Sequence, residues 1–208
     1  MPEELIKKPL LGIFSRDHQA NYEWLIDCLL KYSAVPDIRP VYIGNNTGLT
    51  FRDAVSKCTF AIVYHTLKRG RINITNVTDS LYDDELAYLC ASLGKDNVIV
   101  VIDDLENISP DDRNRILEMQ PSIGYLARDV FLFSTIEKER IPLGNPKKKN
   151  VIPDPKLAQL VDIIKGHHHT RKQCNINDPC KIGIIVAVVV IVSFVIAGLI
   201  YAAEEHLI

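Results

Sequence analysis

Short, mostly apolar runs alternate with amphipathic stretches through residues 1–166 of the chain. The apolar runs are continuous, which is typical of strands covered on both faces in a parallel sheet. Between them, apolar residues recur at the i, i+3, i+4 and i+7 positions of a helix. We predict strands at 10–14, 39–43, 60–64, 98–102 and 130–133, and helices around 51–58, 86–93 and 157–164.

The order of these elements predicts an α/β fold. Ser109-Pro110 and Asp154-Pro155 are typical of helix starts, whereas Gly94 and Gly166 are typical of helix ends. Strict alternation of five strands with five helices predicts a five-stranded parallel, flavodoxin-like sheet flanked by helices and joined by right-handed crossovers.

A second pattern begins near the end of the chain, where the region from Ile182 to Ala203 contains no charged residue. As a helix, these roughly 22 residues extend about 33 Å, which matches the hydrocarbon core of a bilayer. A helix buried in a soluble core would carry a polar face, but only Ser193 and Tyr201 interrupt this run. We therefore predict one C-terminal transmembrane helix at 182–203, with the lipid bilayer as its partner.

Charged residues on either side of the span predict its orientation. Basic residues precede it and acidic residues follow it: Lys165, Arg171, Lys172 and Lys181, then Glu204 and Glu205. The positive-inside rule places the N-terminal part in the cytosol. We predict a cytosolic domain at 1–166, a basic juxtamembrane linker at 167–181 and a lumenal tail at 204–208, so the chain is a single-pass, tail-anchored protein. The Val/Ile-rich span and acidic tail favour the ER and secretory membranes over the mitochondrial outer membrane.

This topology decides how several weaker signals are interpreted. The sequons at Asn45, Asn73 and Asn76 are predicted to carry no glycan, because a cytosolic domain does not meet the glycosylation machinery. Cys174 and Cys180 lie just before the span and are candidates for reversible palmitoylation, with free thiols as the alternative.

Composition and motifs exclude several kinds of site. The net charge is −2, which argues against nucleic acid as a partner. Closely spaced glycines of the Walker or dinucleotide type are absent. A phospho-receiver would need Asp and Lys where His65 and Ser134 end their strands. The triplet 167–169 consists of consecutive histidines without a Cys or carboxylate cluster, so we predict headgroup contacts there and no metal site.

Polar residues follow each predicted strand, and in a parallel sheet these positions share one edge, where ligands bind. They are Ser15 to His18, Gly44 to Asn46, His65 and Thr66, Asp103 and Asp104, and Ser134 and Thr135.

Segments between residues 9 and 135 resemble the TIR (Toll/interleukin-1 receptor) domain family. The similar segments are Gly12 to Asp17 with Tyr22 to Leu25, Phe51 to Cys58 leading into Ala61 to Val63, Asp79 to Leu86, and Val100 to Asp104 with Ser109 to Asp112. The chain departs from the family pattern in one segment. Glu85 follows Ser80 by five residues instead of six, Tyr82 stands where a tryptophan is usual, and Asp83 replaces a cysteine.

The resemblance implies two kinds of function. Members of the family act as homotypic signalling adaptors or cleave NAD with a glutamate on this helix. The first implies protein contacts or self-association without a cofactor. The second implies an NAD or nucleotide N-glycohydrolase with NAD as ligand, Glu85 as the catalytic carboxylate and Ser15, Arg16 and Asp17 as the ligand-binding loop.

Two plainer alternatives stay open. The acidic run from Asp83 to Glu85 is what the dipole of any helix favours at its N-terminus. The domain is alternatively a degenerate α/β scaffold without a ligand. Protein contacts are the function that we expect.

Overall fold

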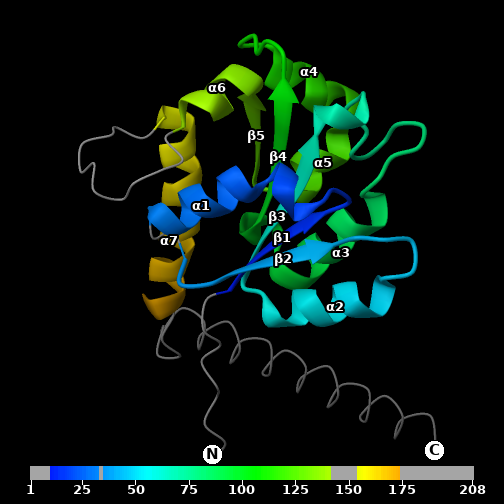
Figure 1. Ribbon diagram of the computed structural model, residues 1–208. Helices are drawn as coiled ribbons and strands as arrows, with labels where there is room; N and C mark the ends of the chain where they lie inside the picture. Colours follow the sequence, from blue (N-terminus) through cyan, green and yellow to red (C-terminus); the bar gives the residue numbers. More distant parts are fainter. Residues whose placement is uncertain (1–9, 33–34, 142–153, 174–208) are drawn as a thin grey trace, which may run out of the picture. The chain divides into compact units, whose positions relative to one another are not determined.

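The computed structural model describes residues 10–32, 35–141 and 154–173 (Figure 1). The chain divides into two compact units, residues 1–168 and 169–208. The first unit contains every strand of the described chain. In the described part of the chain, no helix is both long enough and apolar enough to cross a membrane. The predicted span at 182–203 lies outside the described residues, as do Cys174 and Cys180.

A five-stranded, all-parallel sheet forms the centre of this unit, in the order β2-β1-β3-β4-β5. The α/β class and the parallel sheet are therefore confirmed. The strands are β1 (Leu11–Ser15), β2 (Ile38–Tyr42), β3 (Phe60–Thr66), β4 (Val98–Leu105) and β5 (Asp129–Ser134). This is the flavodoxin-like strand order, whose chain reversal lies between β1 and β3.

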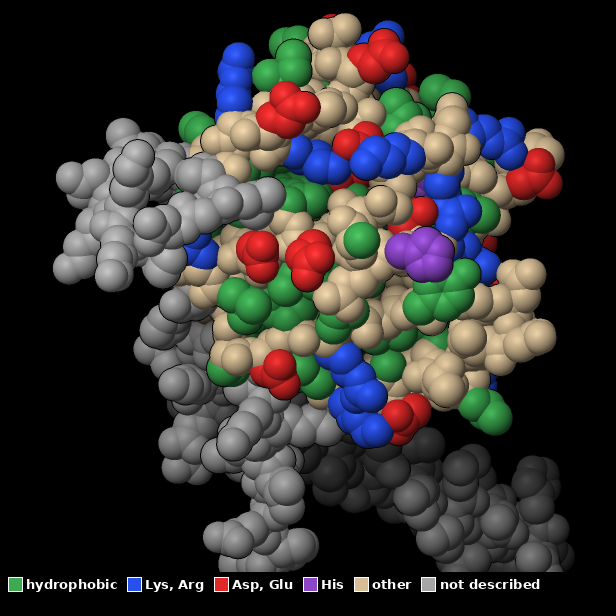
Figure 2. All heavy atoms as spheres, in the orientation of Figure 1, with side chains coloured by type: hydrophobic (Ala, Val, Ile, Leu, Met, Phe, Trp, Pro, Cys, Tyr) green, Lys and Arg blue, Asp and Glu red, His purple; other side chains and the backbone are tan. Residues whose placement is uncertain are grey.

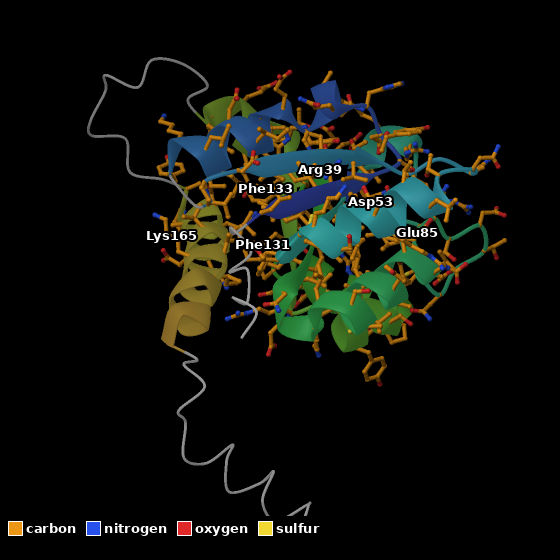
Figure 3. All side chains as sticks on the ribbon, turned by 90° about the horizontal axis from the view of Figure 1, so that it is seen from below. Arg39, Asp53, Glu85, Phe131, Phe133 and Lys165 are labelled. Atoms are coloured by element: carbon orange, nitrogen blue, oxygen red, sulfur yellow. The ribbon has the colours of Figure 1, made fainter. Side chains whose placement is uncertain are left out.

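One face of the sheet is covered by α1 (Glu23–Lys31) and α7 (Pro155–Gln173). Trp24 and Leu25 of α1 and Leu160 of α7 are buried against the inward residues of β1, β3, β4 and β5. Figure 3 shows the side chains of Phe131 and Phe133, both in β5, on the face of the sheet that α7 covers.

The opposite face is covered by four helices: α2 (Gly48–Lys57), α3 (Asp83–Leu93), α4 (Asp112–Met119) and α5 (Pro121–Leu126). Figure 1 shows this division of the helices between the two faces. A further short helix, α6 (Thr135–Arg140), follows β5 directly. Single 3-10 turns occur at η1 (Gln19–Asn21), η2 (Leu67–Arg69) and η3 (Lys95–Asn97). Because both faces are covered, the strands carry the continuous apolar runs seen in the sequence.

Some predicted boundaries are confirmed. Asp154 begins α7, because its Oδ1 accepts hydrogen bonds from the backbone N–H groups of Lys156 at 2.9 Å and Leu157 at 3.3 Å. Gly94 ends α3 with a φ of 85°, a conformation that an L side chain rarely adopts.

Other predicted boundaries are wrong. Ser109 and Pro110 precede α4, which starts at Asp112, and the Ser109 N–H instead donates to the Asp112 carboxylate. Gly166 does not end α7, which continues to Gln173. The strict alternation is also wrong, since α4 and α5 together connect β4 to β5 in the described chain. Gln120 and Pro121 separate them. Proline has no N–H group to donate to a carbonyl of the preceding turn, so α4 ends before it and α5 begins with it.

Candidate functional site

The carboxyl edge of the sheet brings the predicted polar positions together. Ser15 ends β1, and its hydroxyl donates to the Tyr64 carbonyl of β3 at 3.0 Å and accepts from the Asp17 N–H at 2.9 Å. Ser15 is fully buried, so it orders the loop after β1 and has no exposed hydroxyl to offer a ligand. Figure 3 shows Glu85 on the other side of the sheet from α7.

The predicted catalytic carboxylate and the predicted ligand-binding arginine pair with each other. Arg16 Nη2 lies 2.8 Å from Glu85 Oε1, and the two side chains are only 21% and 18% exposed. The same guanidinium donates from Nε to the Leu81 carbonyl at 2.7 Å and from Nη1 to Asn45 Oδ1 at 3.3 Å. Each nitrogen of the Arg16 guanidinium therefore already has an acceptor within the domain.

Tyr82 fixes the backbone beneath this pair. Its hydroxyl accepts from the Arg16 N–H at 3.1 Å and donates to the Tyr64 carbonyl at 3.1 Å. The ring is fully buried. Tyr82, one of the departures from the TIR pattern, thus joins β1, β3 and the start of α3.

A second arginine crosses the gap between β1 and β3. Arg69 of η2 donates from Nε to both carboxylate oxygens of Asp17, at 3.0 and 3.1 Å, and from Nη2 to the Arg16 carbonyl. Asp17, the third predicted ligand-binding residue, is 10% exposed at its side chain. Sequence reasoning missed Arg69, although its place in the turn that follows the buried strand β3 is a signal that could have found it.

Asp103 lies in a buried polar cluster at the end of β4. Its Oδ2 accepts from Trp24 Nε1 at 3.0 Å and from the Tyr64 hydroxyl at 2.6 Å, and lies 2.7 Å from Lys138 Nζ. Burial raises the pKa of the Asp103 carboxyl, while the hydrogen bonds from Lys138 and Tyr64 oppose that rise. Its Oδ1 has no hydrogen-bond partner among the described residues.

Asp104 shares the same lysine. Its backbone has a φ of 59°, and its carboxylate accepts from Thr66 Oγ1 at 2.7 Å and from Lys138 Nζ at 2.7 Å. Burial favours the protonated form, but these hydrogen bonds outweigh burial and hold the pKa of Asp104 below its ordinary value. Lys138 therefore pairs with two adjacent carboxylates, and Lys68 Nζ adds a second positive charge 3.5 Å from Asp104.

His65 of β3 is fully buried, and its Nε2 lies 2.9 Å from the Arg71 carbonyl. Burial lowers the pKa of the imidazole, so the ring is neutral and Nε2 donates to that carbonyl. Ser134, at the end of β5, caps α6 in a reciprocal arrangement with Glu137. Both edge residues therefore have structural partners.

Among the described residues, hollows lie near this edge. One, of about 270 Å³, is lined by Asp17, His18, Gln19, Tyr22, Pro40 and Tyr42. Another, of about 520 Å³, lies between η2 and α4. Glu85 and Arg16 line neither of them. Of the predicted edge residues, Asp17 and His18 border the smaller hollow, and Arg69 holds the Asp17 carboxylate.

The described residues 10–32, 35–141 and 154–166 contain no group of three His, Cys, Asp or Glu side chains placed to hold a metal ion. A scan against protein-family models finds no match, and neither curated proteins nor solved structures give one. At this edge, arginines and lysines are paired with carboxylates of the same domain. Any function of the edge must be compatible with these pairs.

Proposed function

We propose that this chain is a tail-anchored membrane protein whose cytosolic, TIR-like domain works through protein contacts, with the bilayer holding it through residues 182–203. One observation carries the protein-contact part of the proposal. Two ion pairs, Arg16–Glu85 and Arg69–Asp17, lie at the crevice between β1 and β3, where small ligands bind in this strand order.

A small anionic ligand would have to displace these pairs before it reached either arginine. Removing one partner from a largely buried pair leaves an uncompensated charge, which costs about 3–5 kcal/mol when burial is complete. Arg16 would also give up its bonds to the Leu81 carbonyl and Asn45. The sequence resemblance adds weight, since signalling adaptors in that family need no ligand in the crevice.

The rival is the N-glycohydrolase. One observation favours the N-glycohydrolase. The two residues expected to act on NAD, Glu85 and Arg16, lie next to each other, with Oε1 and Nη2 2.8 Å apart. For catalysis, Arg16 would have to leave Glu85 for a phosphate. The carboxylate would then be free to stabilise the positive charge that develops on the ribose.

Catalysis is tested by incubating the full-length chain, reconstituted in lipid vesicles, with NAD and measuring nicotinamide release. We expect release no faster than from protein-free vesicles. Release by the wild type that disappears in Glu85→Gln would overturn the preference for protein contacts. Arg52→Gln is the matched control for loss of a charge elsewhere, because Arg52 packs over the Tyr88 ring at 5.3 Å, outside the crevice.

The anchor is tested separately by alkaline carbonate extraction of cell membranes. We expect the full chain in the membrane pellet and a chain lacking residues 182–203 in the supernatant. Recovery of both proteins in the supernatant would refute the membrane part of the proposal. That result would leave the protein-contact part unaffected.

A further inference from the structure

The 520 Å³ hollow between η2 and α4, here called the α4 groove, has an apolar floor. Leu67 and Ile72 come from the segment after β3, Leu105 from the end of β4, and Ile116 and Met119 from α4. Met119 lines the groove and is 67% exposed, so a partner can reach its side chain.

The wall of the groove is held in place by a buried glutamine. Gln120 is 2% exposed, and its Oε1 accepts from the Ile74 and Thr75 N–H groups at 2.9 and 3.0 Å. Its Nε2 donates to the Ile72 carbonyl at 3.0 Å. The loop and the junction of α4 with α5 are thus joined, so a binding partner would not have to order this wall.

Three charged residues line the groove, namely Glu106, Asp112 and Arg115, and among the described residues Glu106 is the one of these that has no ion pair. Arg113 is paired with Asp129 at 2.7 Å, and Arg115 is paired with Asp112. Among the described residues, no ion pair neutralises the exposed carboxylates of Glu106, Asp111 or Glu118. Asp111 and Glu118 stand four residues before and three residues after Arg115, on the same side of the helix.

We propose that the α4 groove binds a basic amphipathic helix of a partner protein. Apolar side chains one helical turn apart would fill the floor, and lysines or arginines beside them would meet Glu106, Asp111 and Glu118. These carboxylates disfavour anionic lipid and nucleic acid as occupants. This inference rests on the proposed function as a protein-contact domain and names the surface and the chemistry of the partner.

The test uses the full-length chain in nanodiscs of neutral lipid and a fluorescent 18-residue peptide with leucines on one helical face and lysines on the other. Fluorescence anisotropy should show saturable binding that weakens about tenfold in Met119→Glu and about tenfold in Glu106→Lys with Glu118→Lys. Leu49→Glu is the matched control, because Leu49 is 85% exposed and lies outside the groove. We expect it to bind as tightly as the wild type.

Three results would overturn the groove proposal. The first is equal binding by the wild type and Met119→Glu, and the second is equal binding of a scrambled peptide of the same composition. The third is self-association of the full chain that Met119→Glu abolishes, which would make a second copy the occupant. Circular dichroism of each variant confirms that a loss of binding is not a loss of fold.

Photo-crosslinking in cells tests the α4 groove separately from the proposed protein-contact function. A photoreactive residue at position 119 should give adducts that one at position 49 does not. Adducts at 49 but not at 119 would overturn the groove and leave the protein-contact function standing. The absence of adducts at both positions, together with Glu85-dependent nicotinamide release, would overturn both.

Discussion

Replacement of Lys138 by methionine tests how the carboxyl edge of the sheet is held together. The Lys138 ammonium lies 2.7 Å from Asp103 and 2.7 Å from Asp104, and its side chain is 13% exposed. Methionine keeps an apolar stem of similar length but removes the charge. Asp103, which is fully buried, then keeps only the neutral donors of Trp24 and Tyr64.

The expected cost follows from the burial of the pair. Removing one partner of a buried ion pair destabilises a fold by about 3–5 kcal/mol. Asp103 limits this loss of stability by taking up a proton, because burial already raises its pKa. We therefore expect a loss at the lower end of this range, about 3 kcal/mol near pH 7.5. For a domain of this size, 1 kcal/mol shifts the Tm by about 2–4 °C, which gives a fall of roughly 6–12 °C.

The deficit also depends on pH. Loss of the ammonium raises the pKa of Asp103 further above its ordinary value. A carboxyl with a raised pKa binds its proton more tightly in the folded than in the unfolded protein, so the folded variant gains stability relative to the wild type as the pH falls through that pKa. The gap between the two proteins should therefore narrow between pH 7.5 and pH 5.

Thermal unfolding followed by circular dichroism measures these differences on residues 1–168, the compact unit. Lys57→Met is the matched control, because Lys57 and Asp53 form a surface pair whose side chains are 51% and 55% exposed. It should change the free energy of unfolding by less than about 0.5 kcal/mol. The reasoning is refuted if Lys138→Met unfolds within two degrees of this control at pH 7.5, or if the gap stays constant with pH.

Three further predictions follow from single buried groups. Tyr82→Phe removes the hydroxyl that joins β1 to β3 and should cost about 1–2 kcal/mol in chemical denaturation, whereas an unchanged midpoint would show that the hydroxyl is dispensable. Gln120→Ala leaves three backbone groups of the adjoining loop unpaired, so it should lower the free energy of unfolding by about 2–3 kcal/mol and speed hydrogen exchange in that loop. Unchanged exchange would show that Gln120 does not hold the loop. Asn73 is 7% exposed and donates to a backbone carbonyl, so a glycan there is incompatible with the fold. If residues 1–168 are directed to the ER lumen, mass spectrometry of the folded, secreted fraction should find that site unmodified, and a glycan at Asn73 in that fraction would contradict its burial.

The strands were predictable because burial on both faces leaves a continuous apolar run at each one. The ends of β3 and β4 were not, since Thr66 and Asp103 continue the strands as buried polar residues. Such burial is tolerated only with partners, and the partners of Asp103 come from α1 and α6, far away in the chain. Periodicity reports which positions are apolar and carries no information on pairs of this kind.

The candidate site shows the same division. Arg16 was predicted to lie at the carboxyl edge and Glu85 in the acidic run at the start of a helix, and in the structure the two side chains form an ion pair. That they would neutralise each other depends on where α3 starts relative to β1, a distance that spacing along the chain does not specify. Gly166 was predicted to end a helix and does not. Packing at Leu160 and Ile164 stabilises α7, which therefore continues through a residue of low helix propensity.

The single turn η2 connects the closed crevice to the α4 groove. Leu67 at its start lines the groove, and Arg69 at its end holds Asp17 in the crevice. Thr66 caps this turn by accepting from the Lys68 N–H, and Gly70, with a φ of 94°, ends it. A ligand that drew Arg69 out of the crevice would therefore shift Leu67 in the floor of the groove. The Arg69–Asp17 pair therefore holds the turn whose first residue lines the proposed α4 groove, and loss of this pair should weaken peptide binding at the groove.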